Sequence, residues 1–260
     1  MYTITPLKHA IIRAGLAAWI LGANPRVPVA FPVYIWVIEG NDLKCVVDAG
    51  IEEHDPSSPH PIEGGGEMAL REALGKMNLK PEDVDILILT HLHPDHVSYA
   101  KLFHNARIFV QKKEWETAFN PPIPLRRTYY QRLISPLEHL DLCLVDGDVE
   151  IVKGIKVVLL PGHTPGLQGV AVETKEGIYL LASDHFFIRY NISPPKQPVK
   201  MQDLDGNIID IPPAETPFVP PAMPANLIEW YNSCFKALSI TRRSKIIPGH
   251  DPTIVDKKFP

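Results

Sequence analysis

Apolar residues along the chain fall into short runs with strand-like or helix-like spacing, separated by polar turns. In the first half, residues 33–38 and 45–48 are β-branched or aromatic runs, and the turn-forming residues 39–42 between them predict a hairpin. Residues 68–77 carry apolar side chains at positions 70, 73, 74 and 77, which is the spacing of one helix face. Residues 84–89 form a continuous aliphatic run, typical of a strand buried on both faces.

The same alternation continues through the second half of the chain. We predict further strands at residues 107–110, 149–152, 155–160, 169–172, 178–182 and 245–247, and helices at residues 112–119 and 226–240. Strand pairs with interspersed helices occur in each half, and no linker separates the halves. This order predicts an α/β protein with two sheets packed face to face and helices outside them, in a single domain covering residues 1–260.

Composition and charge argue against some classes of partner and cellular location but do not indicate a function. Apolar residues make up 45% of the chain and the formal net charge is −4, so no polyanion-binding surface is expected and nucleic acid is an unexpected partner. The three cysteines, Cys45, Cys143 and Cys234, form no CxxC pair, which fits a reducing compartment. The N-terminus lacks a signal-peptide pattern, and residues 11–21 are too short to span a bilayer. We therefore expect a cytoplasmic protein without a membrane segment.

Metal-ligand side chains follow four of the predicted strands. The run HLHPDH at residues 91–96 comes directly after the buried strand 84–89 and places three histidines and one aspartate within six residues. His163 and His250 each follow a strand through a Pro-Gly turn, and Asp184 follows the strand at 178–182. These four strand ends are expected to aim their side chains at a common point.

The residue types at these positions favour a pair of divalent cations. Imidazole suits zinc and similar metals, and a carboxylate can bridge two of them. Five histidines and two aspartates would fill two sites and leave room for a shared water, which two cations acidify to hydroxide. Zinc is the expected metal, with iron, manganese, cobalt and nickel as alternatives because the same ligands accept them.

The motifs HLHPDH, PGHTPG and PGHD, with the isolated Asp184, resemble in type and order those of the metallo-β-lactamase superfamily over residues 33–250. The resemblance implies a four-layer αββα sandwich with metals at one edge of the sheets. It also implies the ligand groups: His91, His93 and His163 for one metal, and Asp95, His96 and His250 for the other, with Asp184 bridging. Asp95 would act as the catalytic residue that orients the hydroxide and carries its proton.

Within the superfamily, residues 31–38 (FPVYIWVI) and 46–50 (VVDAG) resemble the opening strands of N-acyl homoserine lactonases. This resemblance implies hydrolysis of the ester bond of a lactone, a small-molecule substrate. Those lactonases carry a catalytic tyrosine three residues after the bridging aspartate, where this chain has Phe187. Phenylalanine cannot donate a hydrogen bond, and Tyr190 is the nearby alternative hydroxyl.

Two apolar or Pro-rich stretches, residues 11–31 and 186–224, are predicted to fold over the site and form an apolar pocket. Trp19, Phe187 and Tyr190 are its expected substrate-binding residues. A core helix near the N-terminus or a contact within a homodimer is the alternative reading of these stretches. We expect His185 to have a supporting or structural role, and surface or packing positions for His9, His54, His60, His104 and His139.

Other activities remain open at the level of sequence. A promiscuous carboxylesterase or phosphotriesterase could use the same two metals. A glyoxalase II-like thioesterase is less favoured, because those enzymes carry a C-terminal helical domain and only ten residues follow His250 here. A binding protein without catalysis would be favoured by missing ligands, and all seven are present.

Overall fold

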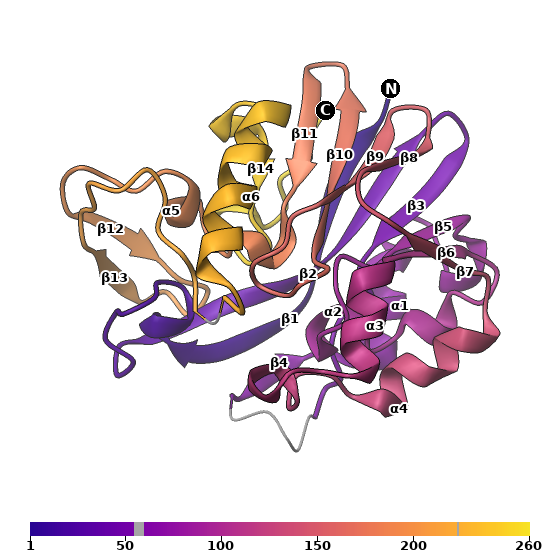
Figure 1. The fold of residues 1–260 in the computed structure, drawn as a ribbon, viewed down its shortest axis with the longest axis horizontal. Coiled ribbons are helices and arrows are strands. Elements are labelled where there is room, and N and C mark those ends of the chain that lie inside the picture. Colours follow the sequence, from indigo (N-terminus) through magenta and orange to yellow (C-terminus); the bar gives the residue numbers. More distant parts are fainter. Residues whose placement is uncertain (55–59, 223) are drawn as a thin grey trace.

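The computed structural model describes residues 1–54, 60–222 and 224–260, and two β-sheets form its centre (Figure 1). The larger sheet has the strand order β4-β1-β2-β3-β5-β6-β7. Its strands are β1 (Thr3–Gly15), β2 (Pro28–Gly40), β3 (Leu43–Val47), β4 (Ile62–Gly64), β5 (Ile86–Ile88), β6 (Arg107–Gln111) and β7 (Leu142–Val145). The smaller sheet has the order β14-β11-β10-β9-β8. Its strands are β8 (Val149–Val152), β9 (Ile155–Leu159), β10 (Gln168–Thr174), β11 (Gly177–Leu181) and β14 (Ile246–Ile247).

Helices cover the outer face of each sheet (Figure 1). Those on the larger sheet are α1 (Gly66–Gly75), α2 (Pro94–Val97), α3 (Lys112–Phe119) and α4 (Gln131–Ile134), and their buried residues pack with Leu87 and Ile108 of the sheet. Helix α6 (Leu227–Ile240) covers the smaller sheet through Trp230. Apolar side chains of both sheets meet between them. The predicted four-layer αββα sandwich is confirmed.

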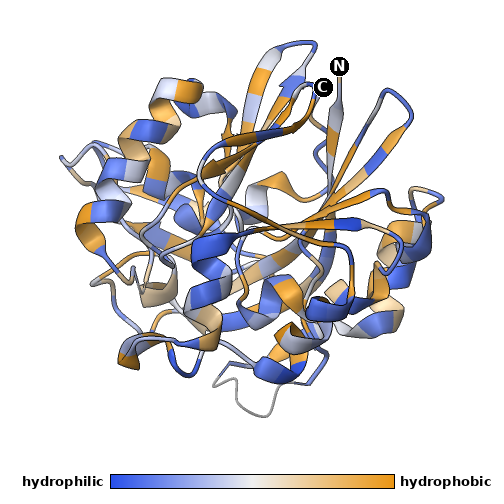
Figure 2. Ribbon diagram, turned by 45° about the vertical axis from the view of Figure 1, so that its right-hand side comes forward, coloured by the Kyte–Doolittle hydropathy of each residue, from blue (hydrophilic) through white to orange (hydrophobic). Residues whose placement is uncertain are grey.

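Strand β2 shows why the sequence folds this way. Its side chains alternate between faces, so that Ile35 and Val37 pack toward the helices while Trp36 and Ile38 pack between the sheets. Figure 2 shows the matching distribution, with apolar segments along the central strands and mixed polar and apolar segments along the helices. The predicted hairpin is confirmed: β2 pairs antiparallel with β3, through a turn whose residues Asn41 and Asp42 have positive φ.

The N-terminal segment differs from the expectation of a core helix. Strand β1 runs through Gly15 and pairs with β2 along its length, and a short 3₁₀ turn, Leu16–Ala18, follows it. The Pro-rich stretch also contains regular structure that was not predicted: α5 (Arg189–Ile192) and the hairpin of β12 (Val199–Gln202) and β13 (Ile208–Ile211). Ile209 and Ile211 of this hairpin share a core cluster with Phe31 and Phe187. Among the described residues, no helix combines the length and apolarity that crossing a membrane requires.

Candidate metal centre

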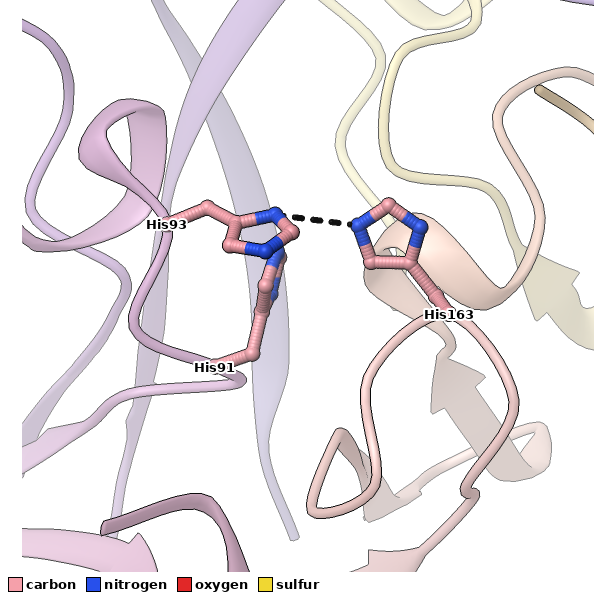
Figure 3. Close-up of side chains that lie close together, drawn as sticks. All are labelled: His91, His93 and His163. Atoms are coloured by element: carbon pink, nitrogen blue, oxygen red, sulfur yellow. Dashed lines mark hydrogen bonds between the residues drawn. The ribbon is translucent and has the colours of Figure 1, made fainter. Parts of the chain in front are cut away.

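Four strand ends meet at one edge of the sandwich, and the structure brings together all seven residues predicted as metal ligands. His91 and His93 lie on the loop after β5, and Asp95 and His96 lie on helix α2, which follows that loop. The segments after β9, β11 and β14 carry His163, Asp184 and His250. Figure 3 shows His91 and His93 on one loop facing His163 on another. The ligating atoms form two groups, each within 4.8 Å: His91, His93 and His163 in the first, and Asp95, His96, Asp184 and His250 in the second.

Asp184 lies between the two groups and offers one carboxylate oxygen to each. Its Oδ1 lies 2.9 Å from Nε2 of His250 and 3.2 Å from Nε2 of His96. Its Oδ2 lies 3.4 Å from Nε2 of His163 and 3.9 Å from Nε2 of His91. A carboxylate that faces two sets of imidazole nitrogens in this way has the position of a ligand shared by two cations.

Hydrogen bonds on the side facing away from the centre orient the imidazole rings of His91, His96 and His250. Nδ1 of His96 donates to Oδ2 of Asp48 at 2.8 Å, and Nδ1 of His250 donates to the Pro32 carbonyl at 2.8 Å. Nδ1 of His91 lies 3.2 Å from the Thr90 hydroxyl, which itself donates to the Asp48 carboxylate. Each contact leaves the opposite nitrogen, Nε2, directed at the centre, which is how ligating histidines are normally oriented.

Electrostatics at the first group suit neutral, metal-binding imidazoles. Burial, with a smaller contribution from His163, lowers the pKa of His93 to about 3, and burial also lowers the pKa of His91 well below its ordinary value. Nε2 of His91 is buried and has no hydrogen-bond partner among the described residues. An unpaired buried polar atom is costly, and a bound cation would remove that cost. The residues of this group therefore fit a divalent cation.

Electrostatics at the second group keep its carboxylates ionised. Burial alone would raise the pKa of Asp95 and Asp184, but the adjacent His96 and His250 outweigh it. The pKa of Asp95 falls to about 2 and that of Asp184 falls well below its usual range. Ionised carboxylates are the form that binds cations.

Sequence reasoning missed two buried carboxylates that support the centre, Asp48 and Glu114. Asp48 precedes the Ala-Gly pair after β3, and its side chain accepts from Thr90 and His96. Glu114 lies on α3, and its side chain contacts the loops that carry His91, His93 and His163. The available signal was an acidic side chain on the buried face of a short amphipathic helix, which also holds Thr117 and Ala118.

A cavity of about 490 Å³ opens onto the centre. His93, Asp95, His163, Asp184 and His250 contribute to its lining from the metal side. Its apolar lining consists of Ile12, Ala18, Phe31, Ile51, Phe187 and Ala222, together with Pro94. The other residues around it are His60, Arg127, Thr128 and Tyr130.

The three predicted substrate-binding residues take different places. Phe187 lines the cavity, with its ring centroid 4.9 Å from that of His250. Trp19 is fully buried behind Phe31, at 6.3 Å between ring centroids, and is not part of the lining. The Tyr190 hydroxyl donates to the Pro212 carbonyl at 3.0 Å, and Tyr190 is not among the residues that line the cavity.

The remaining histidines mostly occupy supporting or surface positions. His185 is buried and stacks on Trp230, with Cys234 Sγ 3.4 Å from its Nε2. His9 is buried, and its ring accepts from the Ile51 amide. His54, His104 and His139 are exposed. His60 is exposed as well, and it also lines the cavity, which the sequence did not indicate.

Comparisons with known proteins agree with the fold. The model of the metallo-beta-lactamase superfamily matches residues 28–250. An N-acyl homoserine lactonase of Bacillus cereus is 30% identical over 172 residues, which is 62% of this chain and 66%, just under two thirds, of that relative.

Two solved structures share the fold. An N-acyl homoserine lactone hydrolase with the product N-hexanoyl-L-homoserine bound at its catalytic metal centre aligns with a TM-score of 0.73 and 23% identity, over 96% of this chain and 93% of that one. AidC, a dizinc quorum-quenching lactonase, aligns with a TM-score of 0.70 and 18% identity, over 96% of this chain and 87% of that one.

Proposed function

Because this chain belongs to the metallo-β-lactamase superfamily, we propose that it is a two-metal hydrolase that opens the ester bond of a lactone. The product would be the corresponding hydroxy acid. The N-acyl homoserine lactonases that it resembles motivate the choice of a lactone. Zinc is the proposed metal, since imidazole and carboxylate ligands suit it.

The observation that carries the proposal is the position of Asp184. It joins two ligand groups through its two oxygens, and the joined groups lie at the wall of a cavity large enough for a small ester. His91, His93 and His163 would hold one cation, and Asp95, His96 and His250 the other. Two cations held there would acidify a water molecule and polarise the scissile carbonyl.

The chain's own residues would position the reactants and move one proton. In the hydrolysis, the water oxygen bonds to the acyl carbon, the ring C–O bond breaks, and one proton passes from the water to the leaving oxygen. The ionised Asp95 carboxylate, which is partly exposed to the cavity, can accept that proton and return it. Phe31 and Phe187 would exclude bulk water and hold the apolar part of the substrate.

The test combines metal analysis with a substrate screen. The protein is loaded with zinc, its metal content is measured, and initial rates are compared for lactones, aryl esters, phosphotriesters and thioesters. Two ions per chain and the highest kcat/KM on a lactone are expected. Fewer than two ions would contradict the dinuclear site, and a thioester preference would favour the glyoxalase II-like alternative over the lactonase.

Aryl-ester or phosphotriester hydrolysis is a second candidate, favoured by one observation. Phe187 occupies the position of the lactonase tyrosine and lines the cavity. The Tyr190 hydroxyl donates a hydrogen bond to the Pro212 carbonyl. Without a hydroxyl at this position, the cavity selects lactones less strongly, while activated water can still attack an aryl ester or a phosphorus centre. Equal kcat/KM values for aryl esters and lactones would support this candidate.

A further inference from the structure

We propose that Glu114 is a positioning residue that holds the first ligand group, His91, His93 and His163, in its metal-binding arrangement. The inference rests on the proposed function, because it takes this group to be a metal site. Glu114 is on helix α3, outside both ligand groups, and its side chain is fully buried. It acts through hydrogen bonds to two different loops.

One oxygen of Glu114 holds the loop of the first two ligands. The Leu92 amide, which lies between His91 and His93, donates to Oε1 at 3.1 Å. The Tyr129 hydroxyl donates to the same oxygen at 2.9 Å. The Tyr129 ring lies against His93, at 5.4 Å between ring centroids. Oε1 therefore restrains both the backbone between these ligands and the ring that packs against one of them.

The other oxygen holds the loop of the third ligand. The Thr164 hydroxyl, next to His163 in sequence, donates to Oε2 at 2.6 Å, and the Gly166 amide donates to it at 3.2 Å. A Cβ atom at Gly166 would clash with the backbone of Glu114, so only glycine allows this loop to approach α3 so closely. The loop of His163 and the loop of His91 and His93 are thus joined through one carboxylate.

The second ligand group has different supports. His96 is held by Asp48 and His250 by the Pro32 carbonyl. Among the described residues, the hydrogen bonds of the Glu114 side chain reach neither helix α2, which carries Asp95 and His96, nor the segments that carry Asp184 and His250. Loss of the Glu114 carboxylate should therefore weaken the binding of one cation and leave the other in place.

Glu114→Gln is the sharpest variant because it keeps the size of the side chain. A carboxylate accepts at both oxygens, but glutamine has a donating NH₂ group in place of one of them. That group would face either Leu92 and Tyr129 or Thr164 and Gly166, all of which are donors. Glu116→Gln is the matched control, since Glu116 is on the same helix and its side chain is largely exposed.

The experiment measures zinc binding by graded chelator competition and zinc content per chain, and compares wild type with both variants. Supporting-residue mutations typically weaken metal affinity by about 10–100-fold. In Glu114→Gln we expect the affinity for one of the two zinc ions to fall by this factor. In Glu116→Gln we expect the affinity for both ions to stay unchanged. In the background of His91→Ala, which already lacks a ligand of the first group, Glu114→Gln should add little. In the background of His250→Ala it should reduce the affinity of the remaining ion.

The outcomes separate this inference from the proposed function. If wild type binds no metal, the proposed function fails, and the inference fails with it. If wild type binds two ions and Glu114→Gln binds both unchanged, or loses both equally, only the positioning role is overturned. If Glu114→Gln does not fold, as judged by circular dichroism, Tyr129→Phe replaces it. That variant removes one of the four hydrogen bonds, and a smaller weakening of the same single ion is expected; an unchanged chelator titration would overturn the role.

Discussion

Phe187 occupies the position at which the resemblance to N-acyl homoserine lactonases implies a tyrosine. Its ring centroid lies 4.9 Å from that of His250 and 6.0 Å from that of His163, so a hydroxyl added to this ring would be close to both ligand groups. We expect Phe187→Tyr to raise kcat/KM for lactones by about tenfold or more, because a hydrogen-bond donor near the reacting carbonyl stabilises developing negative charge. Aryl esters with good leaving groups should gain less. The measurement is kcat/KM for a lactone and an aryl ester in parallel.

Tyr190→Phe is the control for this substitution. Its hydroxyl is already bonded to the Pro212 carbonyl, so the ratio of lactone to aryl-ester activity should not change. If Tyr190→Phe lowers the ratio of lactone to aryl-ester activity and Phe187→Tyr does not raise kcat/KM for lactones, then Tyr190 supplies the catalytic hydroxyl.

Asp95 differs from the other proposed ligands because its side chain is 20% exposed while the Asp184 side chain is only 4% exposed. It can therefore reach a substrate in the cavity. We expect Asp95→Asn to lower kcat by about 10²–10⁴-fold, since an amide cannot accept and return a proton. Zinc content measured on the same sample separates a lost proton carrier from a lost ligand. Full activity of this variant would exclude Asp95 from the chemistry.

The sequence indicated which proposed ligand residues would lie together, but it did not indicate the residues that support them. The histidines and Asp184 could be recognised because each follows a strand end, and backbone topology brings such ends together. The supporting roles of Glu114 and Asp48 could not be assigned in this way, because they depend on distant donors: Glu114 accepts from Gly166, and Asp48 accepts from His96. Contacts of that range are set by tertiary packing, which local patterns do not encode.

At the scale of elements, Asn191 connects the two segments that build the apolar wall. Its Oδ1 accepts from the amides of Phe187 and Ile188, at 3.0 and 2.8 Å. Its Nδ2 donates to the carbonyls of Trp19 and Val219, at 2.8 and 3.0 Å. The N-terminal turn, the start of α5 and the end of the Pro-rich stretch therefore share one buried amide.

Asn191→Ala should lower the free energy of unfolding by about 1–3 kcal/mol, because buried backbone groups lose their partners. It should also raise KM more than it lowers kcat, since the Phe187 wall loosens while the ligand groups keep their own supports. Urea unfolding and steady-state kinetics measure the two effects. Asn105→Ala is the control, because this exposed amide makes a single side-chain bond, to the Glu82 carbonyl. Equal destabilisation by both variants would contradict the role of Asn191.

Secondary structure was predictable where the apolar residues followed the spacing of a helix or of a strand throughout the segment. Helix α3 has the predicted bounds, and α6 begins one residue after Asn226, whose side chain caps it. Strand β1 was not predicted, because its pairing register with β2 shifts between Lys8 and Ala10. This shift breaks the alternation of side chains between the two faces of the sheet. The β12–β13 hairpin is short and lies among prolines, so its pattern is weak. Its position depends on tertiary contacts, such as the one from Asp203 to the Ala30 amide.

At the scale of the whole molecule, the proposed cations would link the two sheets. His91, His93, Asp95 and His96 follow a strand of the larger sheet, whereas His163, Asp184 and His250 follow strands of the smaller one. Each proposed metal group contains residues from both sheets. Metal binding should therefore stabilise the packing of the two sheets as well as supply the chemistry.

Removal of the metal should accordingly lower the melting temperature. A ligand present at 1,000 times its Kd stabilises the folded state by about 4 kcal/mol, and for a chain of this size each kcal/mol corresponds to roughly 2–4 °C. We expect the zinc-loaded protein to melt at least about 8 °C above the chelator-treated protein, with full recovery when zinc is added back. Asp184→Asn should show a much smaller difference, because this residue faces both ligand groups. Identical melting curves for wild type with and without chelator would mean that the ligand groups do not bind zinc across the sheets.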